Sequence, residues 1–173
     1  MNDIIKAMKE RRSIRKFKPD MPPKNLIDEV IEAGLFAASG RNRQGVIIAA
    51  VTDKELRDKL SEMNRKIGGW DEGFDPFYGA PAVLIVLGDK SVPTYLYDGS
   101  LVMGNLMLAA HSVGLGSCWI HRAKEEFESN DGKALLKELG IDGDFEGIGH
   151  CVLGYPDEKK DIIERKENRV FYK

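Results

Sequence analysis

Cysteine is scarce in this chain of 173 residues, which contains only Cys118 and Cys151. The two are far apart in the sequence, and neither has a Cys or His neighbour at the spacing of metal ligands. The sequence therefore predicts neither a zinc site nor a disulfide framework. We expect both cysteines to be buried thiols.

Long apolar runs are also missing. No stretch approaches the roughly 20 apolar residues needed to cross a bilayer, and the N-terminus lacks the apolar core of a signal peptide. The formal net charge is -2, so no overall positive field attracts nucleic acid or anionic lipid. We therefore expect a cytoplasmic protein that binds neither nucleic acid nor membrane.

Two phosphate-binding signatures are absent as well. The chain has no Walker-type loop and no Gly-x-Gly-x-x-Gly motif, which argues against a nucleoside triphosphate and against a dinucleotide bound in the Rossmann manner. Apolar residues nevertheless make up 42% of the sequence. That fraction and the chain length predict one globular domain over residues 1–173.

Helical and strand patterns alternate along the chain. Helices are predicted from Asp3, from Pro23 to Leu35, after Asp53, over Leu101–Val113 and over Asp131–Leu139. The apolar run Val46–Val51 predicts a strand covered on both faces, and Ala82–Leu87 predicts a second buried strand. Further strands are predicted at Ser117–Ile120 and Ile148–Leu153. This order is typical of an α/β or α+β sandwich in which helices flank a central sheet.

The segment Leu101–Val113 is apolar around nearly its whole circumference. Such a helix must be enclosed on all sides. It can be central in its own domain or completed by a second subunit, and the second option needs less core volume from one chain. On this basis we expect Met103 and Leu106 to lie in a subunit interface.

Basic residues concentrate near the N-terminus. Between Lys6 and Lys18, only Glu10 opposes seven basic side chains, and Arg11, Arg12, Ser13 and Arg15 lie where a helix gives way to extended chain. Arginine forks and a serine hydroxyl suit phosphate oxygens. The alternative is a solvated basic face with no ligand.

An aromatic loop follows the predicted third helix, with Trp70, Phe74, Phe77 and Tyr78. These side chains could stack against a planar substrate. We expect instead that the loop packs onto its own domain.

Several segments resemble the nitroreductase family in order and spacing. Arg11-Arg12-Ser13-Ile14-Arg15 is similar to its N-terminal phosphate-binding motif, and Ala38 to Gln44 is similar to its Pro-Ser-x-x-Asn-x-Gln loop. The remaining matches are Gly79-Ala80-Pro81, Asp98 to Ala110, Gly114 to Ile120, Gly149 to Pro156 and Arg169. The resemblance spans nearly the whole chain and implies an α+β fold with a mostly antiparallel central sheet.

The resemblance also implies a homodimer with FMN at its interface, each site being lined by both subunits. Arg11, Ser13 and Arg169 would hold the phosphate with help from Arg12, and Arg15 would lie near the pyrimidine edge of the flavin. Backbone donors near Ile120, His121 and Arg122 would face flavin N5 and O4, and Ser39 and Gln44 would touch the ring or ribityl chain. No side chain is expected to be catalytic, because the flavin carries the redox chemistry.

Two departures from the family pattern lie in one loop. Ala38 stands where the family has proline, and Gly45-Val46 stands where it has Pro-Trp. The chain is also short, with little room for the helical insertion that covers the substrate in larger members. The sequence therefore predicts an open site.

The function implied is that of an NAD(P)H-dependent oxidoreductase working by a ping-pong cycle. A hydride would pass to the flavin, the nicotinamide would leave, and a nitroaromatic, quinone or similar planar acceptor would take its place. The alternatives are an FMN-binding or storage protein, a flavin reductase with little nitroreductase turnover, and a structural domain with an incidental basic patch.

Overall fold

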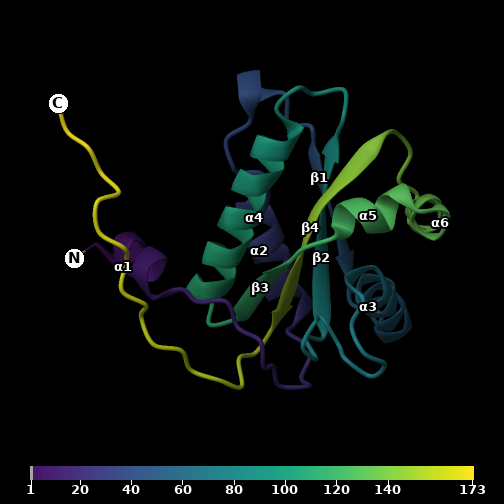
Figure 1. Cartoon of the computed structure of the whole chain (residues 1–173), viewed down its shortest axis with the longest axis horizontal. Helices are drawn as coiled ribbons and strands as arrows, with labels where there is room; N and C mark the ends of the chain where they lie inside the picture. Colours follow the sequence, from purple (N-terminus) through teal and green to yellow (C-terminus); the bar gives the residue numbers. More distant parts are fainter. Residues whose placement is uncertain (1) are drawn as a thin grey trace.

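The centre of the molecule is a four-stranded sheet (Figure 1). The computed structural model describes residues 2–173. The strands lie in the order β1-β2-β4-β3, and every neighbouring pair is antiparallel. This confirms the α+β class. The strand bounds are β1 Val46–Val51, β2 Ala82–Asp89, β3 Gly116–Ile120 and β4 Phe145–Gly154.

Helices cover both faces of the sheet. Helices α2 (Lys24–Leu35) and α4 (Tyr95–Ser112) pack on one face. Helices α3 (Lys54–Gly68), α5 (Ala123–Glu128) and α6 (Asn130–Glu138) pack on the other. Strand β2 is buried between the layers because its side chains alternate between the two cores, with Val83 and Ile85 on one side and Leu84 and Val86 on the other.

Strand β1 differs from the prediction in its environment. The bounds Val46–Val51 are as predicted, but the strand lies at the sheet edge and Ala50 is exposed. A continuous apolar run cannot distinguish an edge strand from a central one, because neighbouring strands are not encoded locally. Side chains of both faces nevertheless pack on the two cores, Ile47, Ala49 and Val51 on one and Val46 and Ile48 on the other, so the predicted coverage holds except at Ala50.

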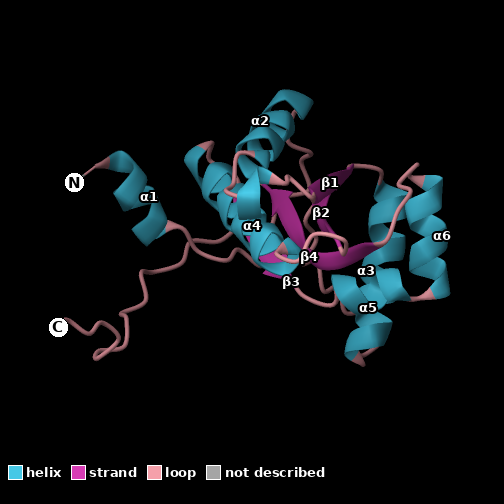
Figure 2. Cartoon of the chain, turned by 90° about the horizontal axis from the view of Figure 1, so that it is seen from above, coloured by secondary structure: helices cyan, strands magenta, loops and turns pink. Residues whose placement is uncertain are grey.

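Two segments stand away from the body. Helix α1 (Asp3–Glu10) has no buried residue. The chain after β4 runs to the C-terminus without a helix or strand, and Figure 2 shows both ends on the same side of the molecule. Arg12 links the two segments, because its guanidinium donates hydrogen bonds to the carbonyl oxygens of Lys9 and Asp161 at 2.8 and 2.9 Å.

In helix α4, Met103 and Leu106 do not lie where a subunit interface would place them, so that expectation was wrong. Both side chains are completely buried against the chain's own sheet, so they do not lie on an outer surface. The outward face carries Tyr97 and Leu101, which are 74% and 50% exposed, and Gly104, whose surroundings are open. The apolar residues of this helix therefore form two faces. The chain's own sheet covers one face, and the other is exposed.

Helix α5 was not predicted. It has only six residues, too few for a helical pattern to be recognised, and it begins directly after Arg122. The helix lies unusually close to β4, because a Cβ on Gly147 would stand 2.3 Å from the carbonyl oxygen of Ala123. A glycine in β4 thus sets the position of α5.

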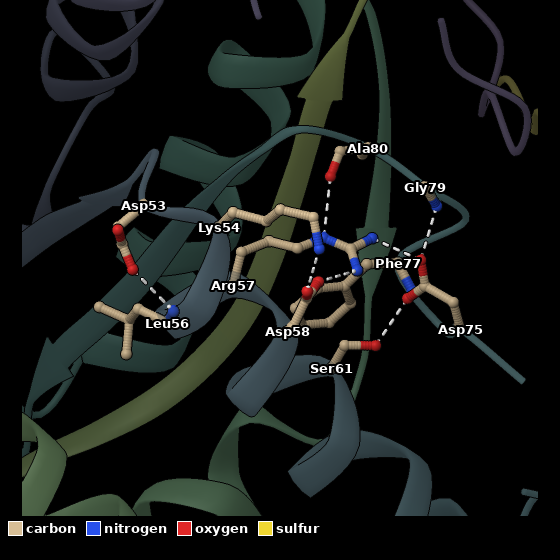
Figure 3. Close-up of polar contacts among 10 residues, drawn as sticks. All are labelled: Asp53, Lys54, Leu56, Arg57, Asp58, Ser61, Asp75, Phe77, Gly79 and Ala80. Atoms are coloured by element: carbon tan, nitrogen blue, oxygen red, sulfur yellow. Dashed lines mark hydrogen bonds and ion pairs between the residues drawn. The ribbon is translucent and has the colours of Figure 1, made fainter. Parts of the chain in front are cut away.

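An ion pair fixes the aromatic loop (Figure 3). Arg57 of α3 contacts Asp75 at 2.5 Å and donates a hydrogen bond to the carbonyl of Ala80 at 2.9 Å. The Asp75 carboxylate also accepts from the Ser61 hydroxyl at 2.6 Å. Phe77 is completely buried beside this pair, so this ring packs into its own domain as predicted, whereas Phe74 is 40% exposed and contacts Trp70 within the loop.

The Asp75 site predicts how stability depends on pH. Burial alone would raise the pKa of Asp75, but hydrogen bonds from Arg57 and Ser61 outweigh burial and hold the pKa below its usual value. A lowered pKa in the folded state stabilises the fold above the unfolded pKa of about 4, and this contribution is lost as the pH falls further. We expect Asp75→Asn to lower the free energy of unfolding at pH 7 by about 1.5–3 kcal/mol and to flatten its decline in acid.

Urea unfolding between pH 3 and pH 7 measures both effects. Asp58→Asn is the matched control, because Asp58 also contacts Arg57 but its side chain is 46% exposed. That variant should change the free energy of unfolding by less than about 1 kcal/mol. Equal losses in the two variants would contradict the role given to Asp75.

Candidate functional site

The N-terminal cations lie along the outer edge of β3. Ser13 forms an isolated parallel bridge with Ser117, and the backbone N–H of Ile14 donates to the Ser117 carbonyl at 3.0 Å. The Ile14 side chain is buried in the core. These contacts bring Arg11, Ser13 and Arg15 to one sheet edge, as a binding cluster requires.

Arg11 is a cation without a counter-charge. Its side chain is half-buried, and it forms no ion pair within residues 2–173. Burial, followed by the neighbouring charge of Arg12, lowers the pKa of Arg11. Its Nη1 atom is buried and has no hydrogen-bond partner among the described residues. Because buried charges are normally paired, this arrangement fits an anion.

Arg12 has a different environment. Besides its bonds to Lys9 and Asp161, its Nη1 donates to the carbonyl of Arg11 at 2.6 Å. Only Nη2 is buried without a partner in the described chain. Its bonded donors therefore hold the backbone next to Arg11 and join it to the C-terminal segment.

The two other predicted arginines are exposed. The Arg15 backbone N–H donates to Glu158 at 2.5 Å, and its guanidinium lies in solvent. Arg169 lies in the exposed C-terminal segment. The cation of this segment whose charge affects Arg11 is Arg165. A single chain therefore does not place Arg169 against the Arg11 cluster, and its role as a phosphate ligand stays a prediction.

The turn from β3 into α5 presents backbone donors. Ile120 is buried, whereas the His121 side chain is exposed. Arg122 has a left-handed backbone, with φ of 78°, and its guanidinium lies 4.5 Å from the centre of the Trp70 ring. Among the described residues, no acceptor pairs with the backbone N–H of His121 or Arg122. Neither amide is therefore engaged by the described chain.

Ser39 and Gln44 meet in a second cluster. The Ser39 hydroxyl accepts from the Gln44 backbone N–H at 3.2 Å, and the buried Asp98 accepts from the Gly40 N–H at 3.0 Å. A cavity of about 130 Å³ lies between this loop and the start of α4. Arg41, Asn42 and Gln44 all have positive φ angles, so the loop that leads into Gly45-Val46 has a strained backbone.

The two clusters lie at opposite ends of α4. Figure 1 shows the segment after α1 near the C-terminal end of this helix, whereas η1 (Gly40–Asn42) lies beyond its N-terminal end. The 18 residues of α4 span about 27 Å. One chain therefore brings Arg11, Ser13 and the β3–α5 turn to the same strand but does not bring Ser39 and Gln44 to them.

A buried polar network beneath the turn was missed from the sequence. Asn64, Glu126 and His150 are all completely buried, and His150 Nε2 lies 2.6 Å from a Glu126 carboxylate oxygen. The available signal was Asn64 itself, which follows Leu60 by four residues on the inner face of α3. Glu126 lies in α5, which is too short for its sequence pattern to indicate which of its residues face inward.

The cysteines agree with the prediction. Cys118 and Cys151 are free and buried, and burial raises the pKa of Cys151 to about 12. Residues 2–173 contain no cluster of side chains suited to hold a metal ion. In the same residues, no helix has the length and apolar character needed to cross a membrane.

Known proteins share this architecture. An FMN-bound nitroreductase from Desulfitobacterium hafniense matches with a TM-score of 0.90 and 26% identity, covering 99% of this chain and 98% of that one. An FMN-bound nitroreductase from Bacteroides fragilis matches with a TM-score of 0.87 and 25% identity, covering 99% of both chains.

Sequence relatives agree. A protein from Archaeoglobus fulgidus, provisionally named an NADH dehydrogenase/NAD(P)H nitroreductase, is 30% identical over 95% of this chain and 91% of its own length. A similar match from Methanothermobacter thermautotrophicus, at 31% identity, covers 68% of this chain and 60% of that protein. The model of the nitroreductase family matches residues 8–68 and 69–158. This chain belongs to the nitroreductase family.

Proposed function

We propose that this protein is an FMN-dependent oxidoreductase that takes electrons from NAD(P)H and reduces planar, electron-poor acceptors such as nitroaromatics or quinones. The observation that carries the proposal is the uncompensated Arg11 cation beside Ser13 on the β3 edge. The FMN bound in the two structural relatives supports the identity of the anion. The relative from Vibrio harveyi, named an NADPH-flavin oxidoreductase, supports the electron donor.

The phosphate end of FMN fits the N-terminal cluster. Arg11 and Ser13 would donate to phosphate oxygens, and the unpaired Nη2 of Arg12 would add a further donor. Arg169 would join them from the C-terminal segment. A dianionic phosphate would offset both causes that lower the pKa of Arg11, its burial and the neighbouring charge of Arg12.

The ring end of FMN fits the turn after β3. The free amides of His121 and Arg122 would donate to flavin N5 and O4. Arg15, exposed on the same sheet edge, would place a positive charge near the pyrimidine edge and favour the reduced state. When bound, FMN supplies the two-electron redox chemistry, so the chain's residues only bind and orient it. One open site for both donor and acceptor fits a ping-pong cycle.

A second subunit would complete each site. If two copies of α4 pack antiparallel across a two-fold axis, the N-terminal end of one helix meets the C-terminal end of the other. Ser39 and Gln44 of one protomer would then reach the Arg11 cluster of its partner. The outward face of α4 supports this arrangement, since it carries the exposed apolar residues Tyr97 and Leu101 together with the small Gly104.

The projecting α1 supports the same dimer. Its exposed side chains include Ile4, Ile5 and Met8. Between α1 and α4 lies a largely apolar groove of about 300 Å³. A helix with no buried residue gains little from its own chain, so contact with a partner would stabilise it.

A flavin reductase with little nitroreductase turnover remains the second candidate, because a Bacillus subtilis relative is named an FMN reductase. Anaerobic visible spectra separate the candidates. We expect the yellow purified protein to bleach with NADH or NADPH and to recover its colour when a quinone or nitroaromatic is added. Recovery only with free flavin would favour the flavin reductase, and a colourless protein that takes up no FMN would overturn the proposed function.

Loss of Arg11 should weaken cofactor binding. Arg11→Ala or Arg169→Ala should each cost about 1.5–3 kcal/mol, or roughly a 10- to 100-fold rise in the FMN dissociation constant, because a charged hydrogen bond to phosphate is lost. Fluorescence titration of the apoprotein with FMN gives the constants. Lys18→Ala, which also removes one exposed cation, should leave them nearly unchanged. Unchanged affinity in both arginine variants would show that the phosphate binds elsewhere.

The dimer should depend on the outer face of α4. We expect Leu101→Glu to abolish dimerisation and FMN retention together, because a charge would be buried in the interface. Sedimentation velocity combined with flavin absorbance measures both properties. Ala134→Glu, on the exposed face of α6, is the control and should leave both unchanged. A stable Leu101→Glu monomer that keeps its full complement of FMN would contradict the shared site.

A further inference from the structure

Asn64 connects α3 to the turn that carries the free amides. It is completely buried, and its Nδ2 donates a hydrogen bond to the carbonyl oxygen of His121 at 2.8 Å. The same nitrogen donates to the carboxylate of Glu126. Both partners are acceptors, so the hydrogen-bond network requires the NH₂ group of Asn64 to face them.

Planarity of the peptide bond extends this contact to Arg122. The carbonyl of His121 and the N–H of Arg122 belong to one trans peptide, in which the two groups point in opposite directions. Because Asn64 holds the carbonyl toward the interior, the Arg122 N–H must point away from it. This N–H is one of the two amides that have no acceptor among the described residues.

The rest of the network holds Asn64 in place. Glu126 accepts from Asn64 with one oxygen and contacts His150 Nε2 with the other, at 2.6 Å. The His150 ring packs against Phe77 and Phe127, with ring centres 5.2 and 6.0 Å away. The carboxylate is therefore fixed from α3, from its own helix and from β4.

The network is not explained by stability alone. Asn64 Oδ1 and His150 Nδ1 are buried and have no partner in the described part of the chain. Buried unpaired polar atoms destabilise a fold, so the network carries a cost at both ends. An apolar side chain in place of Asn64 would remove Oδ1, but it would supply neither the hydrogen bond to the His121 carbonyl nor the one to the Glu126 carboxylate.

We propose that Asn64 is a positioning residue for the flavin: by holding the His121 carbonyl inward, it aims the Arg122 N–H at the flavin ring. The inference rests on the proposed function, because that function places the ring beside this turn. Glu126 and His150 act through Asn64 by fixing its amide. Arg122 keeps its left-handed backbone with the help of Trp70, over whose ring its guanidinium lies.

Amide hydrogen exchange tests the proposal without relying on activity. In wild-type protein labelled with ¹⁵N, exchange at the Arg122 amide should slow by about tenfold or more when FMN saturates the site, as expected for a new hydrogen bond. In Asn64→Ala, FMN should slow this exchange less than about threefold, and the FMN dissociation constant should rise about five- to tenfold.

Leu60→Ala is the matched control. Leu60 is also completely buried and lies four residues before Asn64 on α3. Its apolar side chain forms no hydrogen bond, so its truncation lowers stability without removing a donor to the His121 carbonyl. It should keep the protection of the Arg122 amide and should change the FMN dissociation constant by less than about twofold. Asn64→Leu, which approximately keeps the side-chain size but carries no donor, should behave as Asn64→Ala does.

The outcomes separate the two proposals. The role of Asn64 would be overturned if FMN still slowed exchange at the Arg122 amide by about tenfold in Asn64→Ala. It would also be overturned if Leu60→Ala lost this slowing as fully as Asn64→Ala. Should the Asn64 variants not fold, the wild-type measurement decides: FMN that binds without slowing exchange at Arg122 overturns the positioning role alone. A wild-type protein that binds no FMN overturns the proposed function instead.

Discussion

The hydrogen bond from the Ile14 N–H to the Ser117 carbonyl joins the N-terminal cations to the sheet. Without it, Arg11 and Ser13 would only follow a helix that has no buried residue and little reason to lie against the body. The burial of Ile14 in the core supports this junction. A short backbone pairing thus converts a basic segment into a site with a defined place on the β3 edge.

The two ends of β3 contribute different groups to the proposed site because the strand lies at the sheet edge. Its inner side pairs with β4, and its outer side receives the N-terminal segment near Ser117. Three residues later, the strand ends in the turn at His121 and Arg122, where the amides are free. An anion at one end of the strand and a polar ring at the other would therefore be held by the same short element.

Much of the fold could be predicted because its signals are local. Asp53 caps α3 by accepting from the Leu56 N–H, and Gly69 ends that helix in the left-handed conformation, as the residue types indicate. The edge position of β1 and the inward orientation of Met103 could not be predicted, because both depend on which elements lie alongside. The Arg11 cluster was identified by composition, whereas Asn64 acts across the fold on a turn 57 residues away.

The two buried thiols have a consequence for a protein that handles electrons. Burial raises the pKa of both Cys118 and Cys151, so at neutral pH they remain protonated. Peroxides and other oxidants attack the thiolate rather than the thiol. Neither sulfur is therefore readily converted to a sulfenic acid.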